Sequence, residues 1–466
     1  MTLKLKTSKT KLDMTTGPIM KLIVLFAIPM VIGNILQQLY STADTFIIGN
    51  FCGPASIAAV GTSSQPLEVF MCVFMGIGTG VSILVSIYTG ADDLEKLGNT
   101  VRTAVTFTYM AALPLTVLGI IISPAILRFM QVPADTWSLA VTYIRIVFLG
   151  FLGIMGYNMN AGILRGLGDS AASLLFLVIS TIANIILDVV FIALLGMDVA
   201  GAALGTIIAM YLSWASSIIY IKKKYPELPF TVLPGSLNRE SLVKILKTGL
   251  PLGFNNSVYT VGHIMMQSLI NTQGSYFMAG ASITGRIMGL SSIAITSFAA
   301  AMSTFAGQNF GAENYARLRK GGRIVPLYSG LITMGLGVIM YIFAEPLIRL
   351  FTKDPQTVRF ALLCISLQLP FQWCYCVLNT ILNLSNGIGG VKYSTMINVL
   401  MLWAVRIPSA FLINRFYDGH YVTFGVSISF IFGMIAALTF FRSERWREIV
   451  IRADMQEMKT QNIMAQ

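Results

Sequence analysis

Twelve apolar runs, each about long enough to cross a lipid bilayer, occupy most of this sequence. A membrane-spanning helix needs about 20 predominantly apolar residues. Of the 466 residues, 55% are hydrophobic and only 11% are charged, which excludes a soluble protein. We predict an all-α polytopic membrane protein with transmembrane helices near residues 22–48, 55–88, 101–122, 139–164, 174–195, 201–221, 245–270, 278–305, 324–344, 361–384, 396–413 and 422–441.

The second half of the sequence repeats landmarks of the first half at a nearly constant offset. Gly90-Ala91-Asp92 returns as Gly311-Ala312-Glu313. Six spans make one copy, and an even number of spans brings both copies into the membrane from the same side. We therefore predict two six-helix bundles related by a parallel repeat. This predicted repeat is supported by three pairs of prolines that are separated by the same number of residues: Pro29 and Pro251, Pro124 and Pro346, and Pro133 and Pro355.

The basic residues predict how the chain lies in the membrane. With a cytoplasmic N-terminus, 24 of the 32 Lys and Arg residues fall in tails and loops on the cytoplasmic side, and five fall outside. Cytoplasmic loops are enriched in Lys and Arg, so we predict that both termini are cytoplasmic. The predicted parts are an N-terminal tail (1–21), an N-lobe (22–221), an interlobe linker (222–241), a C-lobe (242–441) and a C-terminal tail (442–466).

The first span carries a stripe of polar residues, which is energetically costly in a membrane helix unless the residues have a function. Asp44 lies deep within it, where a carboxylate is costly. Asn34, Gln37, Ser41 and Asp44 fall within about a quarter-turn of one another at helical spacing, and Tyr40 borders them. We predict that this stripe faces a cavity in the protein.

The fifth span carries a second polar face. Ser180, Asn184 and Asp188 recur every four residues and therefore share one side of a helix. Thr206 in the sixth span lies at a similar depth if the connection between the two spans is short. We expect Asp44, Asn184, Asp188 and Thr206 to converge and to offer oxygen ligands for a cation or a proton relay. A hydrogen-bonded structural role is the alternative for both acids.

The acids are distributed unequally between the two repeats. Only Asp44, Glu68 and Asp188 lie deep in spans, and all three belong to the first half. At the offset of the proline pairs, the counterpart of Asp44 is Met266, so we expect one lobe to handle the ion. Glu68 follows Pro66, and the sequence leaves open whether Glu68 serves at a helix break or in the cavity.

The remaining polar residues exclude several classes of protein. Arg286 and Arg406 lie within spans without an acid at the mirrored position, and we expect them to snorkel or to bond carbonyls of broken helices. His263 and His420 are too far apart for a metalloenzyme motif, and the five cysteines have no metal-ligand spacing. A phosphate-binding G-x-x-x-x-G-K-[ST] loop is absent, which argues against an ATP-driven pump. We predict that the protein is not an enzyme, that it needs no cofactor and that it binds no nucleic acid.

Four motifs follow one another along the chain. They are Pro29 with Asp44 in the first span, the Arg165-Gly-Leu-Gly-Asp169 loop, Asn184 with Asp188, and the run Gly307-Gln-Asn-Phe-Gly-Ala312. Taken alone, the last run is typical of a helix C-terminus with glycine caps. Together, over nearly the whole chain, the motifs resemble the multidrug and toxic compound extrusion (MATE) family of secondary antiporters, in its bacterial branch with N-lobe aspartates.

The resemblance implies particular roles for residues of the N-lobe. Asp44, Asn184, Asp188 and Thr206 match the cation site of the family, where H⁺ or Na⁺ would bind. Its substrate cavity corresponds to Gln37, Tyr40 and Asn158, and we add Asn34 and Glu68 to it. Glu68 departs from the family pattern, which leaves a third titratable group in the cavity as an open question.

The resemblance also implies a fold and an activity. We expect a V-shaped pair of bundles that alternates between outward and inward openings and exports small organic cations in exchange for H⁺ or Na⁺. We favour the proton because it needs only the acids. The protein is expected to be a monomer in the plasma membrane, in contact with the lipid bilayer. A lipid-linked saccharide flippase of the same superfold is the alternative, and it would prefer a basic cavity.

Overall fold

The computed structural model describes residues 12–443 and Trp446, apart from the side chains of residues 54, 65 and 69. Within this part of the chain the secondary structure is helical, without a strand. Helices lie at all twelve predicted positions, which confirms the predicted all-α fold. Most of the predicted tails, 1–21 and 442–466, falls outside the described residues.

Ten of the described helical segments are long and apolar enough to cross a membrane. An eleventh candidate is the pair α4 (Ala134–Leu149) and α5 (Phe151–Gly166), which is bent by 48°. The remaining predicted span is α8 (Arg239–Asn271), a helix of 33 residues. It begins with charged residues and carries several polar ones, so it is less apolar than the others.

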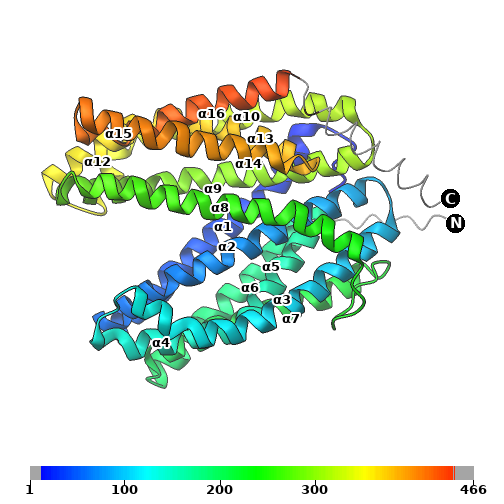
Figure 1. The fold of residues 1–466 in the computed structure, drawn as a ribbon, viewed down its shortest axis with the longest axis horizontal. Helices are drawn as coiled ribbons and strands as arrows, with labels where there is room; N and C mark the ends of the chain where they lie inside the picture. The colour runs from blue at the N-terminus through cyan, green and yellow to red at the C-terminus, as the bar shows by residue number, and fades with distance from the viewer. Residues whose placement is uncertain (1–11, 444–445, 447–466) are drawn as a thin grey trace. The chain divides into compact units, whose positions relative to one another are not determined.

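The described chain forms two compact units. Unit 1 contains residues 12–13 and 28–254, and its helices α3, α5, α6 and α7 run alongside one another (Figure 1). Their bounds and those of the other helices in this half are α1 (Ile19–Phe51), α2 (Pro54–Gly90), α3 (Leu94–Phe129), α6 (Ser170–Asp188), the π-helical turn η1 (Val189–Leu194) and α7 (Asp198–Lys224).

Unit 2 contains residues 14–27 and the described residues from 255 onward. Helix α13 lies at its centre and contacts α9, α10 and α16. The bounds are α9 (Ser275–Gly311), α10 (Tyr315–Ile342), α11 (Ala344–Arg349), α12 (Pro355–Gln368), η2 (Leu369–Phe371), α13 (Gln372–Gly387), α14 (Val391–Val399), the π-helical turn η3 (Leu400–Arg406), α15 (Ile407–Phe416), η4 (Gly419–Tyr421) and α16 (Phe424–Arg442).

The repeat is visible in the backbone. Asp92 and Glu313 both adopt the left-handed conformation, each with φ 54°, where a non-glycine residue is uncommon. They occupy equivalent positions in the two repeats, and each precedes a helix N-cap, Asp93 or Asn314, whose side chain accepts a backbone N–H. The turn that joins the second and third helices of each repeat is therefore built in the same way twice.

The two units do not coincide with the predicted lobes, 22–221 and 242–441. The first part of α1, up to Ala27, packs in unit 2, whereas the first part of α8, up to Phe254, packs in unit 1. Each of these helices carries a proline near the point where it changes unit, Pro29 in α1 and Pro251 in α8. Each unit thus includes the opening segment of the other repeat's first helix.

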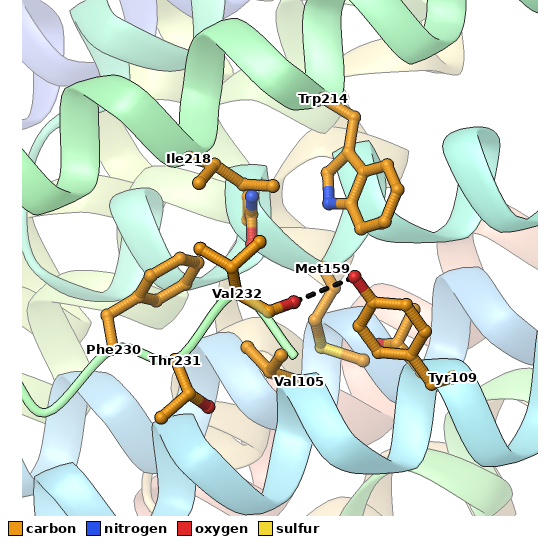
Figure 2. Close-up of a pocket in the computed structure, with 11 residues that line it drawn as sticks. Val105, Tyr109, Met159, Trp214, Ile218, Phe230, Thr231 and Val232 are labelled. Atoms are coloured by element: carbon orange, nitrogen blue, oxygen red, sulfur yellow. Dashed lines mark hydrogen bonds between the residues drawn. The ribbon is translucent and has the colours of Figure 1, made fainter. Parts of the chain in front are cut away.

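The predicted linker, 222–241, is packed against unit 1. Its backbone is held by α3, because the Tyr109 hydroxyl donates a hydrogen bond to the Val232 carbonyl at 2.7 Å (Figure 2). The Gly235 N–H donates to the Thr106 hydroxyl at 3.0 Å. Phe230 is buried in the core of the unit. The linker is therefore an ordered part of unit 1 rather than a free connection.

A buried acid fixes the loop between α5 and α6. Asp169 caps α6 through one carboxylate oxygen, and its other oxygen accepts hydrogen bonds from Tyr220, Tyr225 and Lys224. Burial and the neighbouring Asp169 carboxylate raise the pKa of Tyr225, so its hydroxyl stays protonated and donates. The end of α7 is thereby tied to the start of α6.

The N-terminal segment is held on unit 2 by the Gly307–Ala312 motif. The Met14 N–H donates to the Gln308 side-chain oxygen at 2.9 Å, and the Asn309 amide donates to the Met14 carbonyl at 3.0 Å. Arg317 donates to the carbonyls of Met14 and Thr16. The motif, which the sequence suggested as a glycine-capped helix end, therefore also serves as a latch for the chain that leads into α1. We call Gln308, Asn309 and Arg317 the N-terminal latch.

Removing one arm of the N-terminal latch is expected to loosen this segment. Asn309→Ala deletes one of the two donors to the Met14 carbonyl, which keeps its bond from Arg317, and should lower stability by about 0.5–1.5 kcal/mol, the usual net contribution of one hydrogen bond. Hydrogen–deuterium exchange of residues 14–20 should accelerate, and the thermal unfolding midpoint should fall. Asn383→Ala is the control, since the Asn383 amide bonds only the Asn379 carbonyl of its own helix. Unchanged exchange at residues 14–20 in Asn309→Ala would contradict the latch.

Candidate functional site

The polar stripe predicted on α1 is only partly buried in unit 1, since Ser41 is exposed. Tyr40 and Asp44 are half-buried, as is Asn34, whereas Gln37 is exposed. Tyr40 and Asp44 are four residues apart and therefore lie on the same face of the helix. Gln37 does not join the buried group around Asp44.

The carboxyl groups of Asp44 and Asp188 lie close enough to interact directly with each other. Asp188 is the last residue of α6 and is fully buried. The buried Asn184 amide donates to Asp188 Oδ1 at 3.3 Å. Two carboxylates at this range repel each other, and a proton or a cation between them removes the repulsion.

Tyr40 links the carboxyl pair to α7. Its hydroxyl donates a hydrogen bond to the Thr206 hydroxyl oxygen at 3.1 Å. The Tyr40 hydroxyl also interacts electrostatically with Asp44 and Asp188. Side chains from α1, α6 and α7 thus meet at one place. We call Tyr40, Asp44, Asn184, Asp188 and Thr206 the carboxyl site.

Three oxygen atoms of the carboxyl site are buried without a hydrogen-bond donor. They are Asp44 Oδ1, Asn184 Oδ1 and Asp188 Oδ2. A buried polar atom without a partner costs free energy, and such atoms call for an explanation. Carboxylate and amide oxygens are ligands that hard cations prefer. The donor set therefore fits a small cation or a shared proton.

Gly205 on α7 makes room for the Asp188 carboxyl group. A Cβ atom placed at Gly205 would overlap Asp188 Oδ1. Directly after Asp188, α6 continues into the π-helical turn Val189–Leu194, an irregularity that is common at functional sites. Neither feature was predicted, because a glycine in a membrane helix is common and the sequence of the turn is simply apolar.

Of the predicted cavity residues, Tyr40 belongs to the carboxyl site, whereas Asn34, Gln37, Asn158 and Glu68 do not. The Asn158 amide donates to the Ile154 carbonyl of its own helix, and its side chain lines a small apolar pocket with Met71 and Met155. Glu68 is exposed on α2. Its role stays a prediction, with a helix break and a second cavity charge both open.

A second cavity of unit 1 lies beneath the linker and is a poor candidate for a cation. Phe230 and Val232 of the linker close it against Tyr109, Met159 and Trp214 (Figure 2). It has space for about one water molecule. Its lining contains no charged side chain. The carboxyl site is therefore the better candidate for ion binding.

Comparison with known proteins gives the family. The model of the MatE family matches residues 29–190 and again residues 251–412, which is more than half of the chain. Both boundaries of the second match are displaced from those of the first by the offset that separates Pro29 from Pro251, so the repeat is confirmed. The chain belongs to the MatE family.

Curated relatives of this MatE protein match it over nearly its full length. A probable multidrug resistance protein, YpnP, of Bacillus subtilis (strain 168) is 28% identical over 438 residues, 93% of this chain and 97% of the relative. The probable multidrug resistance protein NorM of Thermotoga maritima is 25% identical, over 94% of this chain and 96% of the relative.

Solved structures share the MatE fold. A multidrug resistance MATE transporter in an outward-facing conformation aligns with a TM-score of 0.87 at 24% identity, over 95% of this chain and 99% of that one. A MATE crystal structure described as the bent conformation aligns with a TM-score of 0.86 at 26% identity and the same coverage. The predicted fold and family are thereby confirmed.

The fit between Gly205 and Asp188 can be tested in this MatE protein by a double-mutant cycle. Gly205→Ala should lower stability by about 1–3 kcal/mol, because the new methyl group displaces the Asp188 carboxyl. In an Asp188→Ala background the same change should cost much less. Unfolding of the purified variants in detergent measures both penalties. Gly61→Ala is the control, since nothing lies within 4 Å of its added Cβ. Equal penalties in the two backgrounds would contradict the contact.

Proposed function

We propose that this MatE membrane protein exports small organic cations in exchange for protons, and that Na⁺ is able to occupy the same site. The observation that carries the proposal is the pair of facing carboxyl groups, Asp44 and Asp188, with buried oxygens that lack donors. The named relatives are multidrug resistance proteins, which supports a small-molecule cargo.

The chemistry of the carboxyl site explains an exchange. When the site carries at least one negative charge it attracts a lipophilic cation, because electrostatic attraction is strong at the low dielectric constant of a site with little water. A proton or Na⁺ bound between Asp44 and Asp188 neutralises that charge. Drug and coupling ion therefore compete, and each weakens the binding of the other by the same factor.

The residues favour the proton over Na⁺ as the coupling ion. Proton transfer needs only the two acids, whereas Na⁺ needs several oxygens placed around it. Asn184 Oδ1 and the Thr206 hydroxyl are such oxygens, so Na⁺ binding remains compatible with the site. Thr206 is the residue whose loss separates the two cases.

We further propose that the protein acts in the plasma membrane as a monomer with both termini in the cytoplasm. The excess of basic residues on one side, 24 against five, supports this orientation. Both repeats of the two-bundle fold lie in one chain, so a second copy is not needed to complete it. The acid pair favours cation export over the flippase alternative, which would prefer a basic cavity.

The two acids are expected to be required for export. Asp44→Asn and Asp188→Asn should each reduce efflux of a cationic dye from cells to background, because an amide neither binds a proton nor carries the charge. Asp93→Asn is the control, since asparagine is an equally good N-cap at this position. Membrane amounts of all variants should be compared first. Wild-type efflux by either site variant would leave that aspartate with a structural role.

The coupling ion is expected to be revealed by Thr206→Val in proteoliposomes. Proton-driven export should stay close to wild type, whereas Na⁺ binding should weaken about tenfold on loss of one ligand. Thr206→Val also removes the acceptor of the Tyr40 hydroxyl, so Tyr40→Phe/Thr206→Val should be assayed beside it. Thr79→Val is the control, because that hydroxyl bonds only its own helix. If wild type shows Na⁺-driven but no proton-driven export, the proton assignment is wrong.

A further inference from the structure

Unit 2 contains a buried cation that the carboxyl site does not use. Arg406 is the last residue of the π-helical turn η3, in the middle of the candidate span Val391–Phe416. The sequence predicts that its side chain snorkels or bonds carbonyls of a broken helix, but the residue is only 2% exposed and donates to hydroxyl groups. A buried charge within a membrane span is costly, so it is a reason to look for a function.

Protein groups satisfy the Arg406 guanidinium only in part. Nε donates to the Ser429 hydroxyl at 3.0 Å, and Nη1 donates to the Tyr259 hydroxyl at 3.3 Å. The guanidinium also lies 5.5 Å from the ring centre of Tyr259 and 5.2 Å from that of Phe430. Nη2 is buried and has no hydrogen-bond partner. The N–H groups of Nη2 therefore lack a hydrogen-bond acceptor.

No carboxylate of the described part of unit 2 neutralises Arg406. The acids described there lie at helix ends or in connections, and none forms a salt bridge with this arginine: Glu313, Glu345, Asp354 and Asp418. Buried charges in proteins are normally paired. Aromatic faces attract a guanidinium, but more weakly than an anion does when water is excluded.

Further polar groups and aromatic rings lie beside Arg406. Tyr259 is partly exposed, and the exposed His263 ring lies one turn further along α8, 4.9 Å from the Tyr259 ring. Tyr375 on α13 stacks on the Phe430 ring, with the ring centres 4.5 Å apart. The α8 side of the guanidinium thus carries a hydroxyl and, one turn further, the imidazole of an exposed residue.

We propose that Arg406, with the hydroxyls of Tyr259 and Ser429, forms an anion subsite that binds the carboxylate of zwitterionic cargo. A carboxylate accepts two parallel hydrogen bonds from a guanidinium, which would satisfy Nη2. The inference rests on the proposed export of organic compounds for its cargo. A small inorganic anion such as chloride has the same charge, and the test distinguishes the two sources.

The test compares two dyes that differ only at one group. Rhodamine B carries a carboxylate beside its cationic ring system, and its ethyl ester lacks that negative charge. Binding is measured by fluorescence anisotropy on purified protein in detergent, without an ion gradient, so the result does not depend on the coupling ion. Arg406→Gln should weaken rhodamine B binding about tenfold and leave the ester unchanged. Asp44→Asn tests the proposed cation site separately: its effect on the ester reports on that site, whereas the difference between the two dyes in Arg406→Gln reports on the anion subsite.

Control variants keep the test decisive. Arg286→Gln removes an exposed arginine from α9 of the same unit and should change neither dye. If Arg406→Gln does not fold, Ser429→Ala and Tyr259→Phe keep the cation and each remove one hydroxyl. Either should lower the preference for rhodamine B over its ester.

The remaining outcomes assign the source or overturn the proposal. If rhodamine B binding is indifferent to Arg406 but chloride raises the melting temperature of wild type and not of Arg406→Gln, the subsite takes an inorganic anion. If both dyes weaken equally in Arg406→Gln, or if neither the dyes nor chloride depend on it, there is no anion subsite and Arg406 is structural.

Discussion

The contact between the carboxyl groups of Asp44 and Asp188 is the interaction on which the site in unit 1 depends. Two acids that face each other inside an apolar bundle are stable only if a proton or cation relieves their repulsion. The neighbouring structure serves this contact: Asn184 orients Asp188, Tyr40 ties α1 to Thr206 on α7, and a glycine opposite leaves space. Occupancy of this one site thus bears on how three helices pack together.

Much of this arrangement follows from helical periodicity. A spacing of four residues puts Asn184 and Asp188 on one face, and a short connection keeps Thr206 at the same depth, so the sequence predicts that these groups meet. The apolar runs predict all twelve helical segments, because a chain that crosses lipid has to satisfy its backbone hydrogen bonds internally and a helix does so. Among the predicted cavity residues, Asn158 and Glu68 lie on other helices and do not join the carboxyl site, and Gln37 is exposed although it shares the polar stripe of Asp44.

The remaining features depend on contacts between segments far apart in sequence. No local sequence pattern predicts that Gly205 packs against Asp188. The same is true of the contact between the linker and α3 through Tyr109. Gln308 and Asn309 carry the signal of a helix end, yet their partner lies near the start of the chain. For Arg406 the sequence predicts either snorkelling to water or bonds to carbonyls of a broken helix, because a lone cation needs one or the other. Its actual position depends on Tyr259 and Phe430, two rings from other helices.

The exchange of opening segments between the repeats limits how the chain can be divided. A gene cut within residues 222–241 would give two fragments of nearly equal length, one per repeat. Neither fragment would contain a whole unit, because residues 14–27 belong to unit 2 and residues 242–254 belong to unit 1. Each half would expose the surface that the other half's segment covers, so complementary fragments have to associate before either is complete. The duplicated halves have thus become interdependent, although each retains the helix pattern of a single six-helix ancestor.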